Sequence, residues 1–208
     1  MATGRRISDY SCVLVVEGYS DLLFYAEALE WVGVADRVFI KHCNGRSDLD
    51  LKLQDLINPG FLAEKTHMGV IVDADQDAEV AEKRFASLLG TLTRKETPGC
   101  GWTKGSPRIG LWVAPGDGLQ GEIESLVWKA WSSDPKNARP KACIESFMAC
   151  MSEAGCSARS RDKAQVSSLL AIRNDEDPRL GPGARAGCFD FARPEFASLL
   201  EFLKGFGR

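Results

Sequence analysis

One apolar segment that ends on alternating acids constrains the fold of this chain more than any other feature. Residues 68–72 read Met-Gly-Val-Ile-Val, which is typical of a buried strand, and Asp73, Asp75 and Asp77 follow at once. While the backbone stays extended, side chains two residues apart point to the same side, so Asp73 and Asp75 are expected to share a face. Carboxylates that close repel each other unless a cation lies between them, and Mg2+ prefers oxygen ligands. The segment therefore indicates either a metal site or an acidic loop in which Asp77 caps the next helix.

The same strand-then-helix pattern recurs along the first two thirds of the chain. The predicted strands are 12–16, 38–43, 68–72 and 109–114, and the predicted helices are about 20–33, 47–57, 78–89 and one that opens at about 121. Ser20 and Ser47 are the expected N-terminal caps of the first two helices, and Gly90 is the expected end of the third. Alternation of this kind implies βαβ units with right-handed crossovers. We therefore predict an α/β fold in which helices flank a Rossmann-like central parallel sheet of about four strands.

The length of the chain, 208 residues, suits one sizeable core. We predict a single domain over 1–208, with its core at about 10–131 and a helical C-terminal extension at about 140–208. Within the extension, helical periodicity covers 142–151, 163–172 and 195–206. Residues 91–108 are rich in Gly, Pro and Thr and are predicted to form a mobile surface loop.

Composition limits the cellular compartment in which the protein is expected and the partners that it is expected to bind. No apolar run is long enough to cross a membrane, and the first residues lack the apolar core of a signal peptide, so we predict a cytoplasmic protein with no membrane partner. The seven cysteines are odd in number and lack zinc spacing, which indicates buried free thiols. A net charge of −3 gives no general attraction to nucleic acid. If the protein binds a polyanion such as nucleic acid, bound metal and local patches of Lys and Arg must supply the positive charge that attracts it.

Acidic residues follow three of the four predicted strands. They are Glu17 after the first strand, Asp73 and Asp75 after the third, and the segment 117–124 after the fourth. Ligands of parallel sheets gather at the carboxyl ends of the strands, which makes this edge the candidate site. Glu17 has an alternative role as an acid that the dipole of the following helix favours. The second strand ends instead near Lys41, a candidate phosphate contact.

Two of these motifs resemble a known domain. Residues 15–21, Val-Val-Glu-Gly-Tyr-Ser-Asp, and 70–75, Val-Ile-Val-Asp-Ala-Asp, resemble the Toprim domain of topoisomerases, bacterial primases and the overcoming-lysogenization-defect (OLD) nucleases. The similarity extends to a family of uncharacterised bacterial Toprim-like proteins of about this size. It rests there on 115–117, on 121–124 and on the tail from Asp162 onward, so it covers nearly the whole chain.

The resemblance implies a role for each acid. Asp73 and Asp75 would bind Mg2+ or Mn2+, and Glu17 would act as a general acid/base or as a further metal ligand. The family pattern selects Glu124 as the inward carboxylate. Glu122 would be a first-turn acid, because two residues on a helix are separated by about 200° and both cannot point into one site.

Further residues are expected around this site. Lys163 would contact phosphate, on the resemblance alone. Asp21 and Asp77 are expected to be helix caps or to support the metal ligands, and capping is the favoured role of both. Gly18 would let the backbone approach a ligand, although a tight turn explains a glycine equally well.

The leading functional hypothesis is a metal-dependent phosphodiester hydrolase with DNA or RNA as substrate. By analogy with the OLD nucleases, a separate ABC-type ATPase would be its partner in phage defence or DNA repair, and the chain is compatible with a homo-oligomer. The alternative is a non-catalytic Toprim module that docks a protein or a nucleic acid. A third class is phosphoryl transfer to an Asp. Phosphatases of this class expect a nucleophilic Asp where this chain has Glu17, and receiver domains expect a paired acid there and a Lys after the fifth strand, neither of which is clear in this sequence.

Overall fold

The computed structural model describes residues 6–95 and 99–208, without the side chains of Arg46 and Ser47. A five-stranded sheet with the order β2-β1-β3-β5-β4 forms its centre. The strands are β1 (Cys12–Val16), β2 (Val38–His42), β3 (His67–Asp73), β4 (Gly101–Trp102) and β5 (Arg108–Ala114). β1 pairs in parallel with β2 and β3, and β3 pairs in parallel with β5. The predicted α/β fold is thereby confirmed, with the short antiparallel edge strand β4 as an addition inside the predicted loop.

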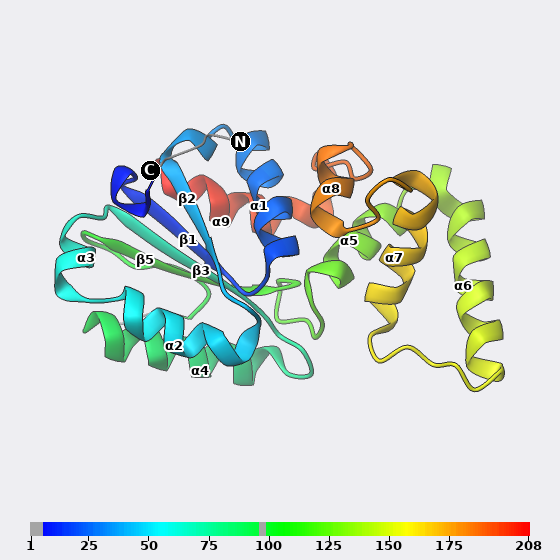
Figure 1. Cartoon of the computed structure of the whole chain (residues 1–208), viewed down its shortest axis with the longest axis horizontal. Helices are drawn as coiled ribbons and strands as arrows, with labels where there is room; N and C mark the ends of the chain where they lie inside the picture. Colours follow the sequence, from blue (N-terminus) through cyan, green and yellow to red (C-terminus); the bar gives the residue numbers. More distant parts are fainter. Residues whose placement is uncertain (1–5, 96–98) are drawn as a thin grey trace.

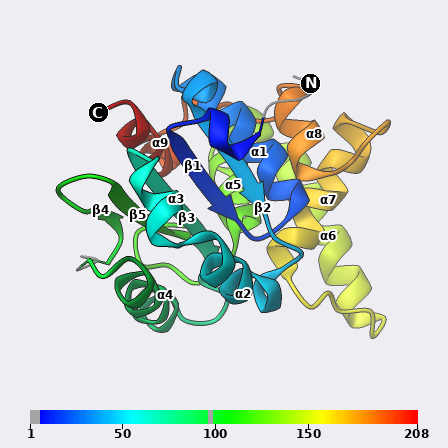
Figure 2. The ribbon, with the colours of Figure 1, turned by 60° about the vertical axis from the view of Figure 1, so that its left-hand side comes forward.

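Helices cover both faces of the sheet and its carboxyl edge (Figure 1). They are α1 (Tyr19–Trp31), α2 (Arg46–Leu56), α3 (Pro59–Ala63), α4 (Ala78–Thr93), α5 (Ile123–Ser132), α6 (Ala138–Glu153), α7 (Arg161–Arg173), α8 (Leu180–Arg185) and α9 (Ala197–Lys204). In Figures 1 and 2, α2, α3 and α4 lie on one face and α1 and α9 on the other. The strand arrows point toward the side where α5 to α8 lie.

The core is divided between the two faces of the sheet because strand side chains alternate. Val13 and Val15 belong to a buried cluster with α2 and α4. Leu14 and Val16 belong to a second cluster, which continues through α1 and α5 into α7, α8 and α9. All four side chains are fully buried, as expected for a parallel strand that is covered on both sides.

Several predicted helix boundaries are wrong. α1 begins one residue before Ser20, with Gly18 as its N-cap, and α2 begins at Arg46 with Gly45 as its N-cap. α4 continues through Gly90 to Thr93, whose side chain is buried and donates a hydrogen bond to the carbonyl of Leu89. Burial of the last turn thus outweighs the low helix propensity of one glycine.

The cysteines are free, as predicted, but the prediction that they are buried is wrong for most of them. Cys12, Cys43 and Cys188 are buried, whereas Cys100, Cys143, Cys150 and Cys156 are exposed. Two of the exposed thiols lie on α6, of which only Ile144 is buried. Within the described ranges, no helix has the length and apolar character needed to cross a membrane.

Gly69 lets the carboxyl-terminal aromatic residues pack closely against β3. A Cβ atom at this position would lie 2.7 Å from Cζ of Phe206 and 3.4 Å from Cζ of Phe202. We expect Gly69→Ala to lower the free energy of unfolding by about 1–3 kcal/mol, because the Phe206 ring must shift. Urea denaturation measures the effect. Gly60→Ala is the control, since its Cβ would meet only Oδ1 of Asn58 at 3.4 Å, and we expect a change within about 0.5 kcal/mol.

Candidate active site at the carboxyl edge of the sheet

Hydrogen bonds from backbone amides to two carboxylates connect three parts of the chain at the carboxyl edge of the sheet. Glu17 follows β1, Asp73 ends β3, and Ile123 opens the helix that follows β5. The Asp73 amide donates to Oε1 of Glu17 at 3.1 Å, and the Ile123 amide donates to Oδ1 of Asp73 at 3.2 Å. The structure therefore brings Glu17 and Asp73 together, as the sequence predicts, and fixes one oxygen of each carboxylate.

Asp75 lies beside this pair but in a different backbone conformation. Its φ of 54° is left-handed, so the chain does not stay extended through Asp75 as the same-side argument assumed. The Asp75 and Gly121 backbones instead exchange hydrogen bonds of 2.9 and 2.8 Å. Gly121 has a φ of 122°, and a Cβ there would lie 2.3 Å from Oγ of Ser125. This glycine-dependent bridge joins the turn after β3 to the start of α5 and leaves the Asp75 side chain exposed.

The acids at this edge raise one another's pKa. The pKa of Asp73 is well above its ordinary value near 3.8, first because of burial and then because of the charges of Glu17, Asp21 and other acids. Burial also raises the pKa of Glu124, whose side chain is largely enclosed, and that of Asp21. Anions in such surroundings favour a bound proton or a bound cation.

Lys163, near the start of α7, supplies positive charge to this group. Its Nζ lies 2.8 Å from Oε2 of Glu122 and 3.5 Å from Oε1 of Glu124. Burial lowers the pKa of Lys163, but the hydrogen bond with Glu122 and the charge of Glu124 outweigh burial and raise it. The prediction that Glu122 and Glu124 cannot share a site is therefore wrong. Glu122 is the N-cap of α5 with an extended backbone, so the 200° separation of helical residues does not apply to it.

The structure also gives the positions of Asp21, Asp77 and Lys41, which the sequence predicts around this site. Oδ2 of Asp21 accepts the Gly18 amide at 2.8 Å, and Oδ1 of Asp77 accepts the Val80 amide at 3.0 Å, so both acids cap helices as favoured. Lys41 lies near the end of β2, opposite Val15 of β1. No ion pair connects Lys41 to an acid in the described part of the chain, and its contact with phosphate stays a prediction.

An open cleft of about 1060 Å3 lies beside the acids. Of the acids described above, Asp75 and Glu122 line it, whereas Glu17, Asp73 and Glu124 do not. Arg159, Arg161 and Lys163 line it from the start of α7 and the segment before it. The cleft therefore combines carboxylates with the local basic residues that a chain of net charge −3 needs in order to bind a polyanion.

The donor chemistry of this edge fits a hard divalent cation. Glu17 and Asp73 offer carboxylate oxygens in surroundings that disfavour uncompensated negative charge. Over residues 6–95 and 99–208, no three His, Cys, Asp or Glu side chains are grouped so that they alone could hold a metal ion. Mg2+ commonly binds through one or two carboxylates together with water and substrate phosphates, so a two-carboxylate site meets its needs.

Sequence reasoning wrongly excluded one residue of this site, Glu122, and missed another, Tyr25. Glu122 holds Lys163 and accepts a hydrogen bond from Ser160, a partner 38 residues away that no local motif indicates. Tyr25 is buried on α1, and its pKa is raised by burial and then by the charges of Asp73, Asp21 and further acids. In the sequence, Tyr25 is one of several residues on the apolar face of a predicted helix, so no motif marked it as part of the site.

Comparisons with known proteins give a family and two solved structures. The sequence matches the family described as "Protein of unknown function (DUF3226)" over residues 11–208. No curated protein matches it. The two solved structures are both of the C-terminal region of the Xanthomonas campestris pv. campestris OLD protein, phased with iodine and with mercury. They share 14% and 13% identity with this chain, have TM-scores of 0.49 and 0.47, and align over 94% of this chain and 95% of theirs.

Proposed function

This chain belongs to the DUF3226 family, and we propose that it is a metal-dependent nucleic-acid phosphodiester hydrolase of the Toprim type. One observation carries the proposal: the carboxylate of Glu17, which follows one strand, accepts the backbone amide of Asp73 at the end of another, in a setting that raises the pKa of Asp73. Such an arrangement favours a bound cation, or a bound proton where no cation is present. The resemblance of both motifs to Toprim supports the same assignment.

The chemistry follows from the positions of these residues. A bound Mg2+ or Mn2+ would supply charge stabilisation to the phosphate oxygens and lower the pKa of water. Glu17 and Asp73 would hold the ion, with Asp75 and Glu124 as further candidate ligands. In the reaction, a water oxygen bonds to phosphorus, the ester P–O bond breaks, and the departing oxygen receives a proton. The alternative role of Glu17, with the ion held by Asp73 and the further candidate ligands, is to accept the proton of the attacking water.

The cleft beside the acids favours a nucleic acid as the substrate. Arg159 and Arg161 lie on one of its walls, where they can neutralise consecutive phosphates of a strand. Lys163 is proposed to exchange its contact with Glu122 for one with a phosphate. The width of an open cleft suits a polymer better than a small enclosed substrate.

A cleavage assay on several substrates tests the proposal. The chain is incubated with single-stranded DNA, double-stranded DNA and RNA, each with MgCl2, MnCl2 or EDTA. We expect cleavage of at least one substrate with metal, none with EDTA, and recovery when metal is restored in excess. Cleavage that persists undiminished in EDTA, or no cleavage of any substrate with either metal, would contradict it.

A specific observation favours a second candidate, a non-catalytic docking module. Lys163 already neutralises Glu122 and Glu124, and the described acids include no three-ligand metal group. A docking module would bind nucleic acid or protein through the basic wall of the cleft without needing a metal. Binding of nucleic acid in EDTA that is equal to binding in Mg2+, with no cleavage, would identify it. The separate ATPase partner stays a prediction from the resemblance.

A further inference from the structure

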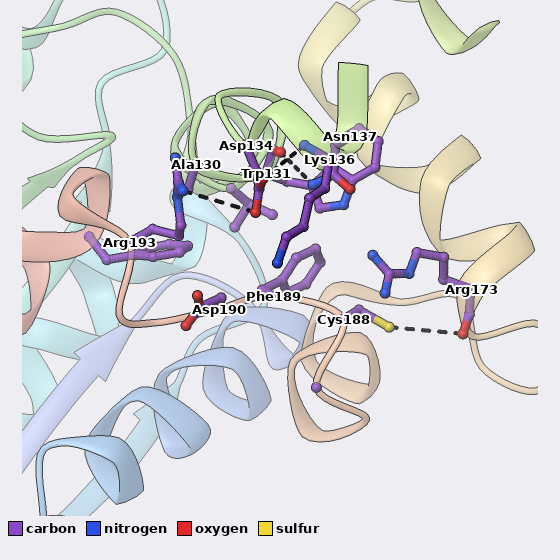
Figure 3. Close-up of a pocket in the computed structure, with 13 residues that line it drawn as sticks. Ala130, Trp131, Asp134, Lys136, Asn137, Arg173, Cys188, Phe189, Asp190 and Arg193 are labelled. Carbon is purple, nitrogen blue, oxygen red and sulfur yellow. Dashed lines mark hydrogen bonds and ion pairs between the residues drawn. The ribbon is translucent and has the colours of Figure 1, made fainter. Parts of the chain in front are cut away.

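A second pocket lies at the other end of α5, and its volume is about 230 Å3 (Figure 3). Its walls come from α5, the 3-10 turn Pro135–Asn137, α7 and the segment 187–193. Trp131 on its wall is seven residues beyond Glu124, which corresponds to roughly 10 Å along a helix. The pocket is therefore distinct from the acidic edge, and its residues take no part in the proposed cleavage.

Two cationic side chains line this pocket without a partner in the described part of the chain. Figure 3 shows that the Lys136 side chain extends into the pocket and that the Arg173 guanidinium points toward it from α7. Among the residues that the structure describes, neither the Lys136 ammonium nor the Arg173 guanidinium makes an ion pair or a hydrogen bond. Converging cations that lack a counter-ion attract an anion.

The acids of the pocket are already engaged. Asp134 accepts the Lys136 backbone amide at 2.9 Å and lies 4.0 Å from the Arg193 guanidinium. Asp190 accepts the Ala192 amide at 2.9 Å. The lining residues therefore carry three positive charges, on Lys136, Arg173 and Arg193, against two negative charges, on Asp134 and Asp190.

We propose that this pocket binds the phosphate group of a small phosphorylated ligand. Arg173 offers a planar set of donors and Lys136 a compact one, and a phosphate monoester has three terminal oxygens to accept from both, whereas a carboxylate has two. The buried rings of Trp131 and Phe189 form an apolar wall beside this group. The volume is below the roughly 300 Å3 at which pockets for drug-sized ligands begin, which suits the phosphate group itself, with the rest of a larger ligand outside the pocket.

Two kinds of ligand carry such a terminal phosphate group: a free mononucleotide and the phosphorylated end of a nucleic acid strand. Tryptophan fluorescence can report binding, because Trp131 lines the pocket and its ring lies 5.3 Å from that of Trp128. The titrants are inorganic phosphate, AMP, and one short oligonucleotide with either a 5′-phosphate or a 5′-hydroxyl. EDTA is present throughout, so that neither cleavage nor metal-bridged phosphate binding contributes.

We expect saturable binding of the phosphorylated probes by the full chain. Arg173→Gln and Lys136→Gln should each weaken it about tenfold or more, because a hydrogen bond to a charged group is lost. Arg37→Gln, an exposed arginine outside this pocket, is the matched control and should leave binding unchanged. Both side chains are exposed and make no ion pair with any residue of 6–95 and 99–208, so the variants should retain the parent's circular dichroism spectrum and melting temperature.

The pattern across probes identifies the source. AMP binding with no difference between the two oligonucleotides assigns a free mononucleotide. Tighter binding of the 5′-phosphorylated oligonucleotide assigns a strand end. No saturable binding of any phosphorylated probe at millimolar concentration, or binding that Arg173→Gln and Lys136→Gln leave unchanged, overturns the proposal. Either result leaves the assignment of the acidic edge untouched, because that edge is tested by metal-dependent cleavage.

Discussion

Asp73→Asn is expected to abolish metal-dependent cleavage while it leaves the fold intact. The amide oxygen can still accept the Ile123 N–H, which is 3.2 Å from Oδ1 in the parent, so local geometry is retained. The charge that would hold the cation is lost. We expect the rate to fall at least about a hundredfold, equivalent to about 2.7 kcal/mol of transition-state stabilisation. Initial rates of cleavage in Mg2+, with circular dichroism to verify folding, measure the effect.

Asp77→Asn is the matched control for that experiment. Asp77 is an exposed acid four residues further along, and its carboxylate caps α4 through the Val80 amide. Asparagine caps helices about as well as aspartate does, so neither stability nor cleavage should change appreciably. If Asp73→Asn cleaves as fast as the parent, Asp73 has no role in binding the metal.

The second large effect is a pH-dependent difference in stability between the parent and Asp73→Asn. The pKa of Asp73 in the folded state is raised above its ordinary value near 3.8, so the folded chain binds more protons than the unfolded chain. The free energy of unfolding of the parent therefore falls as pH rises from about 3.8 through the folded-state pKa. Asp73→Asn has no carboxyl group to ionise at this position, so its free energy of unfolding does not fall in this way. It should be more stable than the parent at pH 8 and no more stable below pH 4.

Thermal unfolding from pH 4 to pH 8, with and without MgCl2, measures this difference. A gain of about 1 kcal/mol would appear as an increase in Tm of about 2–4 °C for a chain of this size. Mg2+ should raise the Tm of the parent at pH 8, less at pH 5 where protons compete, and hardly at all in Asp73→Asn. Equal pH profiles for the two proteins would show that Asp73 carries no electrostatic penalty.

The parallel strands could be predicted because their apolar runs are local signals. Residues 12–16 form β1 as predicted, and the segment around Val70 and Ile71 forms β3. The convergence of Glu17 and Asp73 was predictable as well, since carboxyl ends of parallel strands share one edge. Elements that tertiary contacts determine were not predictable, such as β4, which pairs with β5 although only two residues long.

Side-chain partners distant in sequence limited the prediction of the site. Lys163 was expected to be available for phosphate, but Glu122 and Glu124 bind it, and only the packing of α7 against α5 brings these residues together. The conformation of Asp75 depends in the same way on Gly121, which is 46 positions away. Lys136 and Arg173 show no motif at all, and the fold alone places them in one pocket.

Direct titration of the divalent cation tests the central claim, that acids from separate strand ends bind a common ion. Isothermal titration of Mn2+ into the parent chain and into Asp73→Asn, at pH 8 and without nucleic acid, gives both affinity and stoichiometry. We expect saturable binding by the parent and an affinity at least about tenfold weaker in Asp73→Asn, equivalent to about 1.4 kcal/mol. No binding by the parent at millimolar Mn2+, or equal binding by the two proteins, would contradict the account.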